Sequence, residues 1–334
     1  MVELEGKKIL LIAPYFFGYE QAIKRELAER GGIVDYLQEN IDSASFFQKM
    51  VNKLPEKEQS KIRTTYFINL LKRYNLSEYD YVFGIRLDLF NKQILEYLKK
   101  KCKKAYFILY FWDSVSNMRN PCKIAEYFDK VYTFDPFDYK QNKDKGWLFR
   151  PLFYTNEYAE LQDVSEKDID ILMVASLSPS RANVYLLLKN YARRHGLKLV
   201  AYFYIKPYVY FVNMFKNSGY RKIDKAVIHS HGISTAEICK LLSRTKCVFD
   251  CASPTQTGLT MRTIECLGAR KKIITTNDTV RNYDFYNNKN IKLFSEKDMD
   301  SVLDFVNGGA YQKLSDDIYF KYSIKGWIEE IFDI

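Results

Sequence analysis

The chain has 334 residues, of which 47% are apolar and 28% are charged, a composition typical of globular rather than disordered proteins. This length exceeds what one hydrophobic core supports, so we expect two domains of about 150 residues each. The formal net charge of +10 favours acidic partners. No zinc-finger, RNP or GXXG signature accompanies that charge, so we do not expect nucleic-acid binding.

No apolar stretch is long enough for a membrane span. The only early apolar run covers residues 7–17 and contains a turn, so we do not expect a signal peptide. The six cysteines form no CxxC pair, which argues against a zinc site. We therefore expect a cytoplasmic protein with reduced thiols. The lysines at 99, 100, 101, 103 and 104 could attract an anionic membrane as a peripheral contact, although a solvated helix end explains them equally well.

The first half reads as alternating strands and helices. A buried strand is predicted at residues 7–13, followed by a loop, a helix over 20–30 and a second strand at 33–40. Further strands are predicted at 79–84, 105–113 and 128–135. This order is typical of a doubly wound α/β sheet. The first loop, PYFFGYE, lacks the GxGxxG spacing of a dinucleotide site, so no such cofactor is expected.

Asp113 is the leading candidate for a general base. It closes an apolar strand at the end where open α/β sheets bind ligands, and partial burial there would raise its pKa. The structural alternative is that Asp113 caps the following helix. Glu20 and Asp88 are weaker candidates for the same role. No histidine lies in the first half, and the pair in the HSHG loop lacks a third ligand, so no metal site is predicted.

The second half restarts the alternation with a strand at 168–175, the loop SLSPSR, a helix over 183–194 and a strand at 197–205. In that loop, Ser176 is a neutral donor and Arg181 a basic group suited to a phosphate. An ordinary capped turn is an equally good interpretation.

The segment from 250 to 277 carries the strongest functional signal. It contains a buried strand, a polar turn, a helix predicted to begin near Leu259 and to be closed by Gly268, and a further strand. The N–H groups at the start of such a helix attract a diphosphate. Arg262 and Glu265 share one helix face, and on their own they could form an ordinary surface ion pair. The candidate ligand residues in the turn and helix start are Gln256, Thr257, Gly258, Leu259, Thr260, Arg262 and Glu265.

The stretch QTGLTMRTIECLGARKKIITTN resembles the nucleotide-sugar segment of bacterial GT-B glycosyltransferases that build capsules and lipopolysaccharide. The resemblance is specific only over residues 252–277. It implies two Rossmann-like domains facing across a cleft, with the acceptor on residues 1–155 and the donor on 156–317. It also implies that the terminal helix at about 318–334 packs back on the first domain.

By the same resemblance, Glu265 binds the nucleotide ribose, the preceding turn meets the diphosphate, and Arg262 helps to stabilise the departing diphosphate without a metal. Retaining members commonly carry two glutamates eight positions apart, and the position eight before Glu265 is Thr257. The sequence therefore does not predict retention of stereochemistry.

The expected function is transfer of a hexose from a nucleotide sugar, which the resemblance implies is UDP-linked, to a surface glycan or a lipid-linked oligosaccharide. No cofactor is expected, because the nucleotide sugar is the substrate. Three other functions remain open: a nucleotide-sugar epimerase with the same fold, a non-catalytic protein that binds nucleotides or glycans, and a nucleic-acid binder, which only the net charge of +10 favours.

Overall fold

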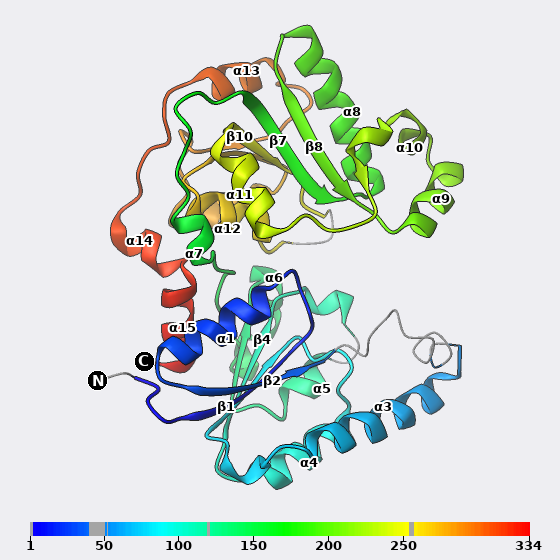
Figure 1. Ribbon diagram of the computed structural model, residues 1–334, viewed down its shortest axis with the longest axis vertical. Coiled ribbons are helices and arrows are strands. Elements are labelled where there is room, and N and C mark those ends of the chain that lie inside the picture. The colour runs from blue at the N-terminus through cyan, green and yellow to red at the C-terminus, as the bar shows by residue number, and fades with distance from the viewer. Residues whose placement is uncertain (1–2, 40–50, 52, 119–120, 254–256) are drawn as a thin grey trace. The chain divides into compact units, whose positions relative to one another are not determined.

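The computed structural model describes residues 3–39, 51, 53–118, 121–253 and 257–334. The chain divides into two compact units (Figure 1). The first comprises Met1–Pro151 with Trp327–Ile334, and the second comprises Leu152–Gly326. The chain thus enters the second unit slightly before the boundary expected at residue 155.

The first unit is built on a parallel sheet of six strands in the order β2-β1-β3-β4-β5-β6. Because β1 pairs with β2 on one side and β3 on the other, the order reverses between β1 and β3. The strands are β1 (Lys8–Ala13), β2 (Ile33–Gln38), β3 (Tyr81–Ile85), β4 (Tyr106–Phe111), β5 (Lys130–Thr133) and β6 (Leu148–Phe149). The helices are α1 (Tyr19–Glu29), α3 (Glu56–Leu71), α4 (Lys92–Lys101), α5 (Pro121–Ala125) and α6 (Pro136–Asn142).

The second unit carries another parallel six-stranded sheet, in the order β12-β11-β10-β7-β8-β9. This is the Rossmann strand order, which reverses between β7 and β10. The strands are β7 (Ile169–Ser176), β8 (Leu199–Tyr204), β9 (Ile228–His229), β10 (Thr245–Asp250), β11 (Lys272–Thr275) and β12 (Ile291–Leu293). The helices are α7 (Asn156–Ala159), α8 (Pro179–Arg194), α9 (Pro207–Lys216), α10 (Ser218–Lys222), α11 (Thr235–Ser243), α12 (Met261–Gly268), α13 (Asp300–Asn307) and α14 (Asp316–Lys321).

The last helix, α15 (Ile324–Phe332), belongs to the first unit from Trp327 onward. Trp327 is completely buried there, with its ring centroid 4.8 Å from that of Tyr110. Glu330 forms an ion pair with the buried Arg150 at 3.1 Å. Aromatic packing and this ion pair therefore hold the C-terminal residues against the first sheet.

Helix α12 differs in detail from the sequence-based expectation. It begins at Met261, with Thr260 as its N-cap, rather than near Leu259. Gly268 is its last residue, and the left-handed backbone that a closing glycine would supply belongs instead to Arg270, with φ of 50°. Glycine is required at 268 for a different reason: an added Cβ would lie 2.4 Å from Cγ of Tyr154.

Candidate functional site

The two sequence-predicted donor segments begin at neighbouring strands of the second sheet. β7 and β10 are paired in parallel, so their carboxyl ends lie at the same edge. The strand order reverses between them. In open α/β sheets, ligands bind at this reversal, beyond the carboxyl ends of the strands. The structure therefore brings the SLSPSR loop and the turn after β10 to one place.

Arg181 joins these two strand ends. Its Nε donates to the carbonyl of Cys251 at 2.9 Å, and its Nη1 donates to the carbonyl of Ser176 at 2.9 Å. The side chain of Ser178 caps α8, so the capped-turn interpretation of this loop is correct for that serine. The two bonds of Arg181 use two of the five N–H donors of a guanidinium. They hold a cation at the strand reversal, where a phosphate would bind.

A buried carboxylate anchors the start of α12. Oδ2 of Asp250 accepts hydrogen bonds from the hydroxyls of Thr260 and Thr263, at 2.6 and 3.0 Å. Burial raises the pKa of Asp250, while the hydroxyl of Thr260 and nearby Arg181 oppose the shift. The hydroxyl of Thr260 also accepts from the backbone N–H of Thr263 at 3.2 Å. The first turn of α12 is thereby fixed to the end of β10.

Residues after β11 hold the turn before α12. The side chain of Asn277 donates to the carbonyl of Gly258 at 3.1 Å, and the hydroxyl of Thr279 donates to that of Thr257 at 2.7 Å. This support is not among the sequence-based expectations, although the polar residues TTN after an apolar strand are a signal for it. The side chain of Leu259 is buried, which leaves its backbone as the part that can meet a ligand. Gln256 lies outside the described residues.

Arg262 and Glu265 form an ion pair at 2.5 Å, with side chains only 13% and 5% exposed. The two residues therefore do form the ion pair that the alternative interpretation predicts. The pair is buried, however, and does not lie on the surface as that interpretation requires. A buried carboxylate held by a guanidinium has a fixed orientation, and such a group suits recognition of hydroxyls better than a mobile surface glutamate.

In the first unit, Asp113 follows β4 at the carboxyl edge of the sheet. Its Oδ1 accepts from the side-chain amide of Asn117 at 3.0 Å, and its Oδ2 lies 3.7 Å from Nη2 of Arg86. The side chain is 31% exposed. The short helical turn Val115–Asn117 has Ser114, not Asp113, as its N-cap residue. Asp113 is thus paired with a cation and does not cap that turn.

Arg86 is a site residue that the sequence analysis missed. It follows β3 and, like Leu87, has a left-handed backbone, with φ of 68° and 59° respectively. Non-glycine residues pay for this conformation, and such strain concentrates at functional sites. No local sequence pattern predicts the left-handed backbone, because neither residue is glycine, asparagine or aspartate.

Aromatic side chains lie at the same edge, in the loop after β1. Tyr15, Phe16 and Phe17 are 62%, 38% and 48% exposed. The ring of Phe16 lies 5.3 Å from that of Trp112, which directly precedes Asp113. Exposed aromatic faces are suited to stacking against sugar rings. Glu20 is fully buried beneath this loop, and its Oε2 accepts from the N–H of Phe16 at 3.0 Å.

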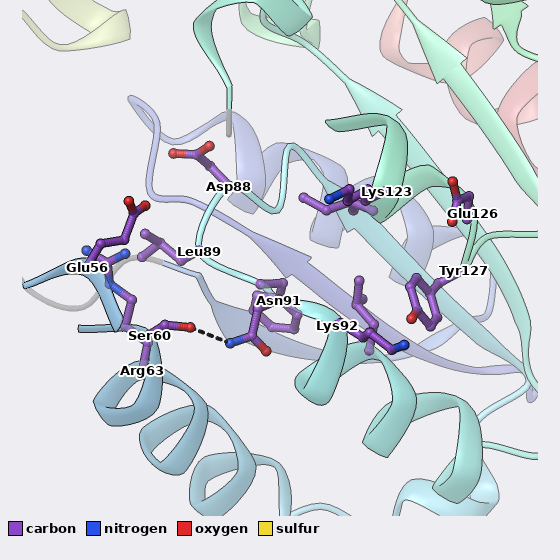
Figure 2. A pocket seen from close by; sticks show the side chains of 13 residues that line it. Glu56, Ser60, Arg63, Asp88, Leu89, Asn91, Lys92, Lys123, Glu126 and Tyr127 are labelled. Carbon is purple, nitrogen blue, oxygen red and sulfur yellow. Dashed lines mark hydrogen bonds between the residues drawn. The ribbon is translucent and has the colours of Figure 1, made fainter. Parts of the chain in front are cut away.

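The described part of the first unit also contains a pocket of about 540 Å³. Asp88 lines it, together with residues of α3, the start of α4 and α5 (Figure 2). A hydrogen bond of 3.0 Å from Asn91 to Ser60 joins two of its walls. The polar lining comprises Glu56, Ser60, Arg63, Asp88, Asn91, Lys92, Lys123, Glu126 and Tyr127.

Glu39, just after β2, is a second acidic group that the sequence did not single out. It is 1% exposed and accepts from the N–H of Leu89 at 2.5 Å. Burial raises its pKa to about 7, although the Leu89 hydrogen bond and Arg86 oppose the shift. A carboxyl group that titrates near neutrality is chemically able to exchange protons with a ligand.

We expect Glu39 to make the protein less stable as the pH rises. Between its ordinary pKa of 4.5 and about 7, the unfolded chain has released a proton that the folded chain still holds, so the free energy of unfolding falls through this window. Glu39→Gln should therefore stabilise the protein by about 3 kcal/mol near pH 8 and have little effect near pH 4. Calorimetric unfolding at both pH values measures this. An equal effect at the two values would contradict it.

The two histidines of the HSHG loop, His229 and His231, lie beside the ring of Tyr202. His229 stacks on Tyr202, with ring centroids 3.7 Å apart and planes inclined by 4°, and burial lowers its pKa. Within the described ranges, no group of three or more His, Cys, Asp or Glu side chains is placed to hold a metal ion. In the same ranges, no helix is both long and apolar enough to span a membrane.

Two of the five lysines between residues 99 and 104 form ion pairs. Lys99 lies 3.1 Å from Asp129, and Lys104 lies 3.1 Å from Asp80. These pairs reduce the positive field that the five lysines would present to an anionic surface.

Comparison with known proteins identifies the fold. No protein-family model matches the sequence, and no curated protein matches it. Among solved structures, Anabaena HepE in complex with UDP-glucose has a TM-score of 0.61 at 9% identity, covering 98% of each chain. A glycosyltransferase from Rickettsia africae has a TM-score of 0.57 at 14% identity, covering 98% of this chain and 97% of that one. The chain has the GT-B fold.

This result confirms the predicted α/β fold of two Rossmann-like domains. The same fold includes a protein from Listeria monocytogenes described as a UDP-N-acetylglucosamine 2-epimerase, with a TM-score of 0.50 and 10% identity, covering 97% of this chain and 94% of that one. At such identities the likeness establishes the fold, so the reaction has to be argued from the residues.

Proposed function

We propose that this protein transfers a hexose from a UDP-linked donor to a surface glycan or a lipid-linked glycan. The observation that carries the proposal is the meeting of Arg181, the start of α12 and the buried Arg262–Glu265 pair at the reversal between β7 and β10. The bound UDP-glucose in HepE, which has the same fold, supports the donor class.

The charge distribution of the second unit suits a departing nucleoside diphosphate. In the proposed complex, Arg181, Arg262 and the first turn of α12 stabilise the negative charge that develops on the diphosphate. Glu265 accepts hydrogen bonds from the ribose hydroxyls. Ser176, Gln256, Thr257, Gly258, Leu259 and Thr260 supply the surrounding hydroxyl, amide and backbone contacts.

The first unit supplies the acceptor site in this proposal. Asp113 takes the proton of the attacking hydroxyl if the reaction inverts, and Arg86 orients the carboxylate. The exposed rings of Tyr15, Phe16 and Phe17 stack on the acceptor sugars. The pocket in Figure 2 offers charged and amide partners for further hydroxyl groups.

Capsule or lipopolysaccharide synthesis is the biological setting that we propose, with the protein in the cytoplasm and in peripheral contact with the inner face of the cell membrane. A binding panel with UDP, GDP, CMP and ADP compounds tests the donor assignment directly. Stabilisation by a nucleotide other than UDP, with no response to UDP, would reject the uridine donor.

An epimerase is the second candidate, because a protein of that description shares the fold. Incubating the purified protein with the donor alone distinguishes the two reactions, since an epimerase needs no acceptor. Formation of the epimeric nucleotide sugar would overturn the transferase proposal. Binding of UDP without any turnover, with acceptor glycans present, would instead indicate a non-catalytic binding protein.

We expect glycosyl transfer to persist in excess EDTA. Cationic side chains and a helix start can stabilise the diphosphate without a divalent ion, and the proposed site consists of such groups. The initial rate with and without EDTA measures this. Complete loss of transfer in EDTA, restored by added manganese, would contradict the proposal of a metal-independent enzyme.

A further inference from the structure

Helix α9 (Pro207–Lys216) carries its apolar residues on the outside. Tyr208, Phe211, Val212 and Phe215 are 68%, 61%, 45% and 70% exposed. Their spacing of i, i+3, i+4 and i+7 places them on one face of the helix. We call these four side chains the aromatic stripe. A helix on the surface of a soluble protein normally turns such a stripe inward, so its exposure requires an explanation.

The opposite face of α9 already contacts the core of the second unit. Val209, Tyr210 and Met214 pack against that core, and the side chain of Asn213 donates to the carbonyl of Val209 at 2.8 Å. These contacts attach α9 to the second unit, so the aromatic stripe is not needed for that attachment. The exposed rings of Phe211 and Phe215 pack edge to face, with centroids 5.0 Å apart.

Basic side chains lie at both ends of α9 and in the segment that follows it. Lys206, Lys216, Arg221, Lys222 and Lys225 are all exposed, and Asp224 is the one acidic residue between 206 and 225. Asp224 forms an ion pair with Lys189 at 2.6 Å. Arg221 donates to the carbonyl of Met214 at 3.0 Å, which brings a cation to the C-terminal end of α9. The flanks of the stripe therefore carry a strong local positive charge.

We propose that α9 docks onto an anionic lipid bilayer, with the aromatic stripe in the headgroup region and the surrounding cations at the lipid phosphates. An amphipathic helix that combines Phe and Tyr with flanking Lys and Arg binds membrane interfaces in this manner. With ten residues, α9 is too short to cross the bilayer. The charge complementarity favours lipid over a second copy of this basic chain, whose own stripe carries the same flanking cations.

The position of α9 gives this contact a consequence. It follows β8 directly, and β8 pairs with β7. The helix thus begins at the same carboxyl edge of the second sheet as the candidate donor site (Figure 1). A bilayer held by α9 would keep that edge near membrane-borne molecules. Vesicle binding itself requires no glycosyl transfer, so α9 can dock on a bilayer whether or not the proposed reaction is correct.

Vesicle flotation of the full-length protein tests the aromatic stripe. Vesicles of phosphatidylcholine and phosphatidylglycerol in equal parts should bind the wild type, and Phe211→Ser with Phe215→Ser should reduce the bound fraction about tenfold or more. The matched control is Phe137→Ser with Leu148→Ser, which removes two exposed apolar side chains elsewhere and should bind as the wild type does. Wild-type binding by the stripe variant would overturn the proposal.

A second pair of variants tests the flanking cations. The variant Lys216→Glu with Lys222→Glu should bind vesicles more weakly, and its binding should depend less on salt. The matched control is Lys240→Glu with Lys297→Glu, which changes the net charge equally at exposed positions outside the segment from 206 to 225. This control should weaken binding much less. Equal losses from both pairs would show that overall charge, not α9, attracts the vesicles. Sedimentation velocity decides the remaining alternative: a dimer that the stripe substitutions dissociate, with vesicle binding retained, would assign the stripe to self-association and overturn the proposal.

Discussion

Replacing Glu265 with glutamine is expected to weaken UDP binding by about tenfold to a hundredfold, because a neutral amide replaces a carboxylate in charge-assisted hydrogen bonds to the ribose. Glutamine keeps the volume of the side chain and can still accept a hydrogen bond from Arg262. The variant should therefore fold. Isothermal titration calorimetry with UDP, well below the unfolding temperature, measures the loss.

The burial of the Arg262–Glu265 pair determines which variants are informative. Glu265→Ala would remove the partner of a guanidinium that is only 13% exposed, and breaking such a pair costs about 3–5 kcal/mol of stability. Weaker UDP binding by that variant would be difficult to separate from partial unfolding. The double variant Arg262→Gln with Glu265→Gln removes both charges together and provides the matched control for stability.

Two outcomes are possible for the glutamine variant. Loss of UDP affinity with a nearly unchanged unfolding temperature would support Glu265 as a ligand group. Unchanged UDP affinity in a folded Glu265→Gln protein would show that the pair only fastens α12, and the ribose would then have to bind elsewhere. The burial of this pair cannot be predicted from the sequence, because the spacing of three residues is the same for an exposed pair and a buried one.

The sequence predicted the features of this fold that depend on local patterns. Apolar runs bounded by turns identified most strands, and the order of strands and helices indicated two doubly wound sheets. The segment from 250 to 277 was assigned to a ligand site because a polar turn precedes a helix after a buried strand. Parallel pairing then determines that this turn and the loop of Arg181 start from adjacent strand ends.

What the sequence did not predict depends on contacts between distant residues. Asn277 and Thr279 support the turn at Thr257 and Gly258 from the segment that follows β11. Arg86 reaches Asp113 from the end of a different strand. Glu39 titrates near neutrality because its surroundings exclude water, and burial of this kind cannot be read from a glutamate that follows an amphipathic strand.

Asp113→Asn is expected to lower the turnover number by about a hundredfold or more while leaving donor affinity unchanged, provided that the enzyme inverts. Asparagine keeps the volume of the side chain but cannot take up the proton of the acceptor hydroxyl. Turnover and UDP-sugar binding of the purified variant are the two measurements. Inversion is established from the anomer of the product, and a retained configuration would remove the need for this base.

The surroundings of Asp113 supply the control. Asn117 donates to Oδ1 of Asp113 at 3.0 Å, so Asn117→Ala removes that partner and leaves the carboxylate in place. If Asp113 serves only to hold its loop, both variants should reduce activity alike and lower the unfolding temperature together. If it is the base, Asn117→Ala should cost a few-fold at most, whereas Asp113→Asn loses most of the turnover.

The pH dependence distinguishes Asp113 from its rivals. Three other carboxylates of the first unit could be the base. Glu20 is fully buried and holds the loop at Phe16, and Asp88 lines the pocket of Figure 2. Glu39 differs from both because its pKa is raised to about 7. If Glu39 were the base, the rate would rise with pH through about 7, since the ionised form accepts the proton, and Glu39→Gln would abolish that rise. An Asp113→Asn protein within a few-fold of wild type, together with such a dependence, would transfer the role to Glu39. The same Arg86 that pairs with Asp113 also lowers the pKa of Glu39, so either carboxylate would act beside one cation.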